Sequence, residues 1–283
     1  MLAAAVFLLR SEWEKLQIRS EHYEAETGKL PEGGTLRVVF FSDLHHYLPA
    51  VHDQQKIIHE IEKADPAAVL IGGDLLSVRK QGGSPVETGS VLSLLEKIAQ
   101  KYPVYYGDGN HEVRFRERRP GEYAEYVEKL LSSGIRYLPD GVLDLCEGVK
   151  IFSCSLEKEY YQKLSPGFSK KTPMKEGYFF EKSGLSDSES YNILLVHSPM
   201  YLKEAAAAGA DLVLSGHMHG GTVRLPGGAG LMTPQFQFFV KECSGEHTLG
   251  KTKMIVNRGL GTHSIRIRLN DLPEISVIDI KGK

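Results

Sequence analysis

The sequence predicts an α/β protein built around one principal domain. Short apolar runs recur along its 283 residues, and several are followed by a polar residue and then by a segment with helical spacing of apolar positions. No internal repeat, low-complexity tract or interdomain linker interrupts the chain, and 41% hydrophobic residues permit a sizeable core. In open α/β sheets, ligands bind beyond the carboxyl ends of the strands, so the residues after each run are the expected site.

Residues 1–34 form a separate N-terminal segment in this interpretation. Leu2 to Leu9 are apolar throughout and end at Arg10. Eight residues cannot span a bilayer, which needs about 20. They are read either as a short helix lying on the domain or as the remnant of a membrane anchor, and we favour the anchor because so apolar an end is unusual. Residues 11–34 are polar, with Leu16 and Ile18 alternating against charged neighbours, and predict an extended edge segment.

The first half of the domain alternates strands with helices. Ile57, Ile58 and Ile61 have helical spacing, as do the apolar residues between 91 and 98. The predicted strands are 36–41, 69–71 and 104–106. Each strand is followed within a few residues by an Asp, or by an Asn-His pair.

The second half is less regular. The predicted strands are 149–153, 192–196 and 211–214, with a helix at 205–208. Near the end of the chain, Ile265, Ile267 and Leu269 alternate with polar residues, and residues 275–280 form another apolar run. Both are predicted to be closing strands.

Five short motifs after these runs carry oxygen and imidazole ligands suited to Mn, Fe, Co or Zn. They are Asp43-Leu44-His45, Gly73-Asp74, Gly109-Asn110-His111-Glu112, His197 and Gly216-His217-Met218-His219. Two such ions about 3.5–4 Å apart can clamp the attacking and leaving oxygens of an in-line displacement. Asp74 is the natural bridging carboxylate, because its strand lies between two other motifs in the chain.

The spacing within the motifs predicts their geometry. Asp43 and His45 are two residues apart, as are His217 and His219, so in an extended segment each pair would point to one side. The Asn110 amide is a neutral ligand and leaves the next histidine free for the cleft. Each motif alone has an ordinary structural explanation, such as a turn or a core histidine. Their joint occurrence after successive strands favours a two-metal site.

At these motifs the chain resembles the calcineurin-like metallophosphoesterase superfamily, over about residues 35–280. The resemblance implies a four-layer αββα sandwich of two mixed β-sheets flanked by helices, with 35–283 as the metallophosphoesterase domain. It also implies one metal, most often Mn, held by Asp43, His45, Asp74 and His219. A second metal would be held by Asp74, Asn110, His197 and His217. His111 matches the family histidine that contacts the phosphoryl group and assists the leaving group.

Further motifs resemble one bacterial branch of this superfamily. They are Gly216–Gly221, Arg224-Leu225-Pro226, Asn257–Thr262 and Arg266 through Pro273-Glu274-Ile275. Members of that branch often carry an N-terminal membrane anchor, work at the cell envelope and include hydrolases of the UDP-2,3-diacylglucosamine type. The resemblance therefore implies a membrane-associated protein of the bacterial cell envelope, with the side of the membrane left open.

The chain departs from the superfamily pattern at two informative positions. Ser77 stands where protein Ser/Thr phosphatases carry an Asp, which disfavours a protein-phosphatase activity. His263 replaces a residue that is small in the branch, and with Arg114 and Arg116 it is a candidate for binding substrate at the cleft rim. Two stretches rich in aromatic residues, which include Tyr160 and Tyr161, are expected mainly to pack on the sheets.

These observations predict a phosphoesterase with two metal ions that hydrolyses phosphate mono- or diesters by in-line attack of a metal-bridging hydroxide. The alternatives are a nucleotide-sugar or lipid pyrophosphatase of the UDP-2,3-diacylglucosamine hydrolase type, a nuclease, and a non-catalytic metal-binding scaffold. A net charge of −2 argues against broad binding of nucleic acid, which favours a strongly basic face. We expect a phosphoester substrate, membrane association of the full-length protein, no nucleic acid and no obligate protein partner.

Overall fold

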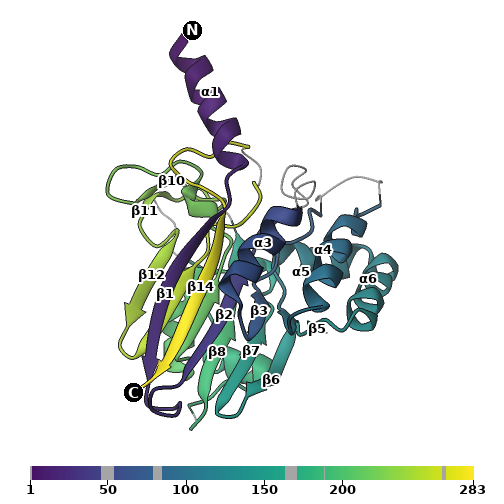
Figure 1. The fold of residues 1–283 in the computed structure, drawn as a ribbon, viewed down its shortest axis with the longest axis vertical. Coiled ribbons are helices and arrows are strands. Elements are labelled where there is room, and N and C mark those ends of the chain that lie inside the picture. The colour runs from purple at the N-terminus through teal and green to yellow at the C-terminus, as the bar shows by residue number, and fades with distance from the viewer. Residues whose placement is uncertain (1, 46–53, 79–84, 163–170, 188, 263–265) are drawn as a thin grey trace.

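Two six-stranded β-sheets stack face to face in the computed structural model, and helices cover both outer faces (Figure 1). The structure describes residues 2–45, 54–78, 85–162, 171–187, 189–262 and 266–283. The predicted four-layer α/β sandwich is therefore confirmed.

The first sheet has the strand order β1-β14-β2-β3-β4-β5. Its four strands from β2 to β5 run parallel, while β14 is antiparallel to β2 and pairs in parallel with the edge strand β1. The bounds are β1 Arg19–Thr27, β2 Thr35–Phe41, β3 Ala68–Ile71, β4 Val104–Tyr106, β5 Arg136–Tyr137 and β14 Glu274–Gly282. The carboxyl ends of β2, β3 and β4 consequently meet at one edge of the sandwich.

The second sheet has the order β12-β13-β9-β8-β7-β6, with a parallel centre and an antiparallel strand at each edge. Its bounds are β6 Asp140–Cys146, β7 Val149–Cys154, β8 Tyr191–Leu195, β9 Leu212–Ser215, β12 Gly245–Leu249 and β13 Thr252–Val256. A separate hairpin joins β10, Gly230–Met232, to β11, Phe238–Val240.

The helices divide between the two outer faces. The first sheet is covered by α3 Gln54–Ala64, α4 Gly89–Ala99, α5 Asn110–Arg118 and α6 Pro120–Ser132. The second sheet packs against α7 Tyr178–Ser183, α8 Leu202–Ala207 and the short 3₁₀ turns η1 Lys158–Tyr161 and η2 Pro199–Tyr201. A third 3₁₀ turn, η3, spans His219–Gly221.

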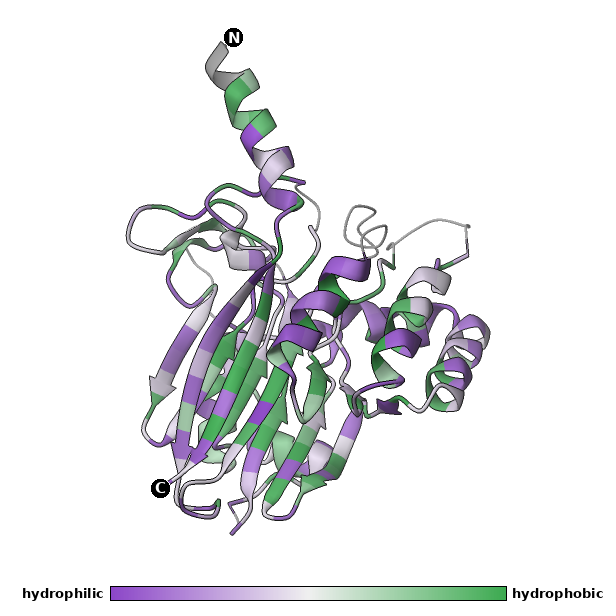
Figure 2. Ribbon diagram, viewed as in Figure 1, coloured by the Kyte–Doolittle hydropathy of each residue, from purple (hydrophilic) through white to green (hydrophobic). Residues whose placement is uncertain are grey.

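Alternation along each strand explains why both sheet faces are buried. On β2, Val38 and Phe40 point into the core between the sheets, whereas Val39 and Phe41 pack under the helices. Side chains alternate between the faces of a strand, so a strand covered on both sides has a nearly continuous apolar sequence. Figure 2 shows this as green along the central strands of both sheets.

The N-terminal segment begins with a helix, α1, Leu2–Lys15, and not with the extended conformation expected from residue 11. Only after Lys15 does the chain extend, into edge strand β1. The amino-terminal part of α1 projects away from the sandwich (Figure 1). Leu8, Leu9 and Trp13 are 54%, 70% and 53% exposed, so this helix presents apolar side chains to solvent. Within the described chain, no helix is long and apolar enough to cross a membrane.

Of the two predicted closing strands, one forms in the described residues, while Ile265 of the other lies outside them. The second apolar run is β14, but residues 266–273 form no strand, and Leu269 makes a single isolated bridge to Val223. The reason is Arg268, whose buried guanidinium donates hydrogen bonds to the carbonyls of Arg258, Gly259 and Gly261. This segment therefore wraps around a buried cation, which the alternation of apolar residues does not reveal.

Candidate metal centre

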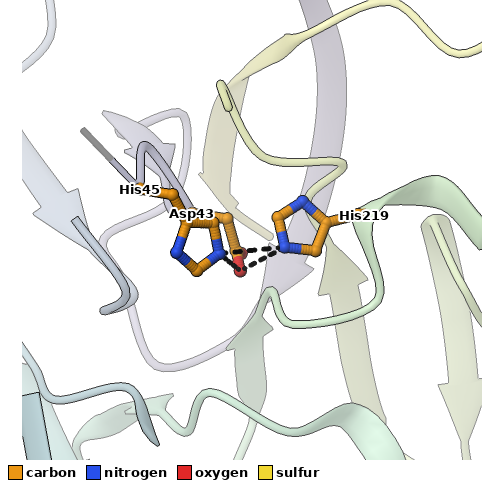
Figure 3. Close-up of side chains that lie close together, drawn as sticks. All are labelled: Asp43, His45 and His219. Carbon is orange, nitrogen blue, oxygen red and sulfur yellow. Dashed lines mark hydrogen bonds and ion pairs between the residues drawn. The ribbon is translucent and has the colours of Figure 1, made fainter. Parts of the chain in front are cut away.

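Loops from both sheets bring the predicted ligands together at one end of the sandwich. Three overlapping groups of buried side chains have ligand atoms within 4.8 Å of one another: Asp43, His45 and His219; His45, Asp74 and His111; and Asp74, His197 and His217. Figure 3 shows the first group, with its carboxylate between two imidazoles. The first sheet supplies the carboxylates, Asn110 and two imidazoles, and the second sheet supplies three imidazoles.

The distances within this cluster are short. Nε2 of His219 lies 3.2 Å from Asp43 Oδ1 and 3.0 Å from Nε2 of His45. On the other side, Nε2 of His197 lies 3.2 Å from Asp74 Oδ2 and 3.6 Å from Asp43 Oδ1. The two carboxylates thus occupy the middle of the cluster, with imidazoles on both sides.

The backbone at the ligands is left-handed, so the expectation that each i, i+2 pair sits in an extended segment is wrong. Asp43, His45, Asp74, His217 and His219 all have φ between 46° and 68°. Ten non-glycine residues in the described ranges have positive φ, and these five are half of them. Such conformations cost on the order of 1–3 kcal/mol each and persist only where the surroundings fix them. The ligands therefore reach one point from tight turns.

Each carboxylate uses one oxygen for support and turns the other toward the cluster. Asp43 Oδ2 accepts hydrogen bonds from the hydroxyl of Ser42 at 2.6 Å and the backbone N–H of His217 at 2.9 Å. Asp74 Oδ1 accepts the backbone N–H of His111 at 2.7 Å. The bond between Asp43 and the amide of His217 also ties the loop after β2 to the loop after β9.

Several buried ligand atoms lack a hydrogen bond from the described residues. Asn110 Oδ1 and His217 Nε2 are two of them, and Asp43 Oδ1 is a third. Nδ1 of His197 donates to the carbonyl of Gly72 at 2.7 Å, which leaves the Nε2 lone pair directed at the carboxylates in the neutral ring. An imidazole fixed through its second nitrogen by a backbone carbonyl is the usual arrangement of a metal-ligating histidine.

The buried carboxylates and imidazoles of the cluster strongly shift one another's pKa values. Burial alone would raise the pKa of Asp43, but the imidazoles of His219 and His197 outweigh it and hold that pKa well below its ordinary value. For His197 burial lowers the pKa, yet Asp74 and Asp43 raise it to about 10. Burial and the neighbouring His197 lower the pKa of His217 to about 3. Two buried carboxylates here require positive charge beside them.

These residues fit divalent metal ions. Buried acceptor atoms without hydrogen bonds, imidazoles with lone pairs directed inward and two low-pKa carboxylates are the donor set that Mn, Fe, Co and Zn accept. The 3.0 Å separation of the His45 and His219 Nε2 atoms suits two ligands of one ion at metal–nitrogen distances of about 2.0–2.1 Å.

His111 is held differently from the other imidazoles. Its Nδ1 accepts the backbone N–H of Val78 at 2.7 Å, so the neutral ring carries its proton on Nε2. Beside it, Nη1 of Arg114 donates to the carbonyl of Val78 at 2.7 Å and lies 3.4 Å from Nε2 of His111. Val78 therefore positions both a ring N–H and a guanidinium at the edge of the cluster.

Glu112 holds together two of the loops that carry site residues, a role that the sequence analysis did not assign. Its fully buried carboxylate accepts backbone N–H groups of Asp74 at 2.7 Å and Gly109 at 2.9 Å, and the hydroxyl of Tyr106 at 2.8 Å. Burial raises its pKa to about 7, and the charge of Asp74 adds to the shift. A Cβ on Gly109 would come within 2.2 Å of Asp74 Oδ1, so the two loops pack together closely. A Glu directly after two site residues is the sequence feature that could have pointed to this role.

The predicted rim residues have separate positions. Arg116 pairs with the buried carboxylate of Asp108 at 3.3 Å, whereas Arg114 lies beside His111. His263 lies outside the described residues. Tyr161, one of the aromatic residues expected mainly to pack on the sheets, has its ring 5.0 Å from that of His217 at 64°. Burial raises the pKa of this phenol well above its ordinary value, and the charge of Asp74 raises it further.

Comparison with known proteins gives consistent matches. Residues 36–221 match the family described as calcineurin-like phosphoesterase. An uncharacterized metallophosphoesterase of Bacillus subtilis, YkuE, is 29% identical over 95% of this chain and 87% of its own length. An uncharacterized metallophosphoesterase of Aquifex aeolicus is 25% identical over 100% and 99%. Among solved structures, the Haemophilus influenzae NAD nucleotidase NadN matches 81% of this chain and 46% of its own, with 16% identity and a TM-score of 0.46.

Proposed function

The chain belongs to the calcineurin-like phosphoesterase family and is a metal-dependent phosphoester hydrolase, and from that premise we propose that it hydrolyses phosphate mono- or diesters at two metal ions. The observation that carries this proposal is the convergence of the ligand groups at one end of the sandwich. The groups overlap through His45 and Asp74, as expected if adjacent ions share ligands.

The proposed ligand sets divide the cluster into two halves. One metal is held by Asp43, His45, Asp74 and His219, and the other by Asp74, Asn110, His197 and His217. Asp74 is the proposed bridge, which is supported by its strand, β3, lying between β2 and β4 and by its membership of two groups. Mn is the proposed metal, with Fe, Zn or Co as alternatives, and the excess of imidazole over carboxylate ligands argues against Ca²⁺.

The chain's own residues supply the remaining chemistry. When bound, two divalent ions lower the pKa of a water to near neutrality and neutralise charge on phosphoryl oxygens. The Nε2–H of His111, fixed by Val78, donates to a phosphoryl or leaving-group oxygen. Arg114 provides a second donor beside it, with its reach limited by the bond to the Val78 carbonyl. Both donors are pre-positioned, so they stabilise developing charge without reorganisation.

A nucleotide-sugar or lipid pyrophosphatase is the second candidate for the substrate. The observation that favours it is a pair of exposed apolar side chains on a hairpin that contacts the turn containing His219. Phe238 and Phe239 in the β10–β11 hairpin are 49% and 65% exposed, and the hairpin packs against the turn after His219. Figure 1 places this hairpin and α1 at the same end of the molecule. A substrate with an acyl tail would fit such a surface. A non-catalytic scaffold is disfavoured, because no ligand is missing.

We also propose that α1 associates with a membrane surface at the bacterial cell envelope. The exposed Val6, Leu8, Leu9 and Trp13 support an interfacial position. One short apolar segment gives only marginal, reversible binding, since stable anchoring takes two signals. Weak binding to vesicles is therefore expected from this segment alone.

The experiment is an activity panel on chelated and reconstituted protein. Aryl phosphates, bis-aryl phosphates, nucleotide sugars and phospholipids are assayed after chelation and after addition of Mn²⁺, Co²⁺, Fe²⁺, Zn²⁺ or Ca²⁺. We expect no turnover in the chelated protein, recovery with the transition metals and little recovery with Ca²⁺. Full turnover without metal would refute the proposal.

A further inference from the structure

Tyr161 is a half-buried residue beside the metal centre, and its hydroxyl oxygen is buried. It is the last residue of η1, and its ring meets that of His217 edge-on at 5.0 Å and that of His197 at 6.1 Å. η1 also packs against α5, the helix that begins at Asn110. The side chain therefore lies against His197 and His217, two of the three imidazoles that the second sheet supplies.

The hydroxyl of Tyr161 is buried and has no hydrogen-bond partner in the described part of the chain. A buried polar group without a partner costs about 1–3 kcal/mol, and native proteins rarely leave one unmatched. A phenol hydroxyl is a hydrogen-bond donor. A ligand that accepts this hydrogen bond would remove the penalty.

Other buried phenols nearby are matched. Tyr178 donates to the carbonyl of Ser155 at 3.2 Å, and Tyr201 donates to the carbonyl of Thr172 at 3.1 Å. Tyr106 donates to Glu112. Tyr161 therefore differs from these three phenols, because its hydroxyl has no such partner and its ring contacts two imidazoles of the ligand cluster.

We propose that the hydroxyl of Tyr161 donates a hydrogen bond to an oxygen of the phosphate group bound at the metal centre, which makes it a substrate-binding and catalytic residue. This inference rests on the proposed function. His111 groups with His45 and Asp74, whereas Tyr161 lies against His197 and His217. A phosphate at the centre is therefore held by a donor on each side, and both act on the group common to all phosphoester substrates.

The test is Tyr161→Phe in the full chain, with Tyr160→Phe as the matched control. Tyr160 precedes it in the same turn, but its ring packs against Tyr178 and Tyr201 in the core of the second sheet. Both variants keep an aromatic ring and lose one oxygen atom. The readouts are kcat/KM on an aryl phosphate, inhibition by inorganic phosphate, metal content and Tm, all with Mn²⁺.

Loss of one hydrogen bond to a charged acceptor is expected to lower kcat/KM of Tyr161→Phe about 10- to 100-fold and to weaken phosphate inhibition by a similar factor. Metal content should match wild type and Tm should not fall, because the removed hydroxyl is unpaired in the ligand-free protein. Tyr160→Phe should keep its activity and its phosphate inhibition. A Tyr161→Phe protein with wild-type kinetics, or one whose loss merely follows lost metal, overturns the inference.

Failure of the proposed function can be told apart from failure of the Tyr161 inference, because the first is seen in the wild-type protein and the second only in the variants. If wild-type protein has no metal-dependent esterase activity, the proposed function fails, and calorimetric binding of inorganic phosphate to the Mn²⁺-loaded protein then tests Tyr161 alone. Weaker phosphate binding in Tyr161→Phe than in Tyr160→Phe supports the inference. Equal binding in both variants contradicts it.

Discussion

The ligand cluster and the projecting helix α1 lie at the same end of the molecule but are built in opposite ways. In the cluster, Asp43, Asp74 and His197 are at most 1% exposed, and each is fixed by hydrogen bonds from neighbouring loops. In α1, Leu8 and Leu9 are more than half exposed. The ligand cluster consists of buried polar side chains held by hydrogen bonds, whereas the amino-terminal part of α1 exposes apolar side chains to water.

The contrast is repeated inside α1 itself. Ser11 and Glu14 near its carboxyl end are buried and accept the backbone N–H groups of Arg268 and Asp271 at 3.1 Å. The loop that contains Arg268 supports Gly261, whose N–H donates to the carbonyl of Asp43 at 2.7 Å. The carboxyl end of α1 is therefore tied to the loops that support the metal centre, while its amino-terminal part is exposed. The boundary between the buried and the exposed part lies near Arg10.

The largest effect is expected from Asp74→Ala, which removes the proposed bridge. Activity should fall more than about 100-fold, since the metals supply several kcal/mol of transition-state stabilisation. Steady-state turnover of an aryl phosphate with Mn²⁺ measures the loss. Asp144→Ala, at an exposed position on β6, is the control and should keep its activity. Comparable activity in the two variants would mean that Asp74 is not a ligand.

His111→Ala is expected to lower kcat about 100-fold or more while metal content stays unchanged. The reason is that the ring is proposed to donate a hydrogen bond to the substrate and not to coordinate a metal ion. His59→Ala, on the exposed side of α3, is the control. Elemental analysis beside the kinetics separates the two roles. A metal-free His111→Ala protein would place this histidine among the ligands.

Deletion of residues 2–9 is expected to leave turnover of a small soluble ester intact, because the buried contacts of Ser11 and Glu14 remain. The same deletion should abolish the weak binding to vesicles. Extending the deletion to residue 16 removes those contacts and should lower both Tm and activity. A large loss of activity in the shorter variant would show that the exposed part of α1 also supports the catalytic fold.

The smallest effect concerns pH. In metal-free protein the pKa of His197 is raised to about 10 from an ordinary value near 6.5, so its stabilisation is complete below pH 6.5 and is lost as pH rises toward 10. The Tm of chelated protein should therefore fall between pH 7 and 8.5. His197→Gln should flatten that slope. An increase in Tm over this range in chelated wild type would contradict the charge coupling described for the cluster.

The sequence predicted the parts of the molecule that depend on local pattern. Strands β2, β3 and β4 follow from apolar runs that are buried on both faces, and the ligand motifs lie directly after them. The left-handed conformation of Asp43 and His45 depends on contacts with other loops, so spacing alone led to the wrong expectation of an extended segment. The roles of Arg268 and Tyr161 also depend on tertiary contacts that no local pattern reveals.

Metal stoichiometry of the reconstituted wild-type protein tests this account most directly. The protein is chelated, loaded with Mn²⁺, freed of excess ion and analysed for metal per chain, with activity followed during the titration. We predict close to two ions per chain, and activity that reaches its maximum only as the second ion binds. Full activity at one ion per chain, or no bound metal, would contradict the two-metal centre.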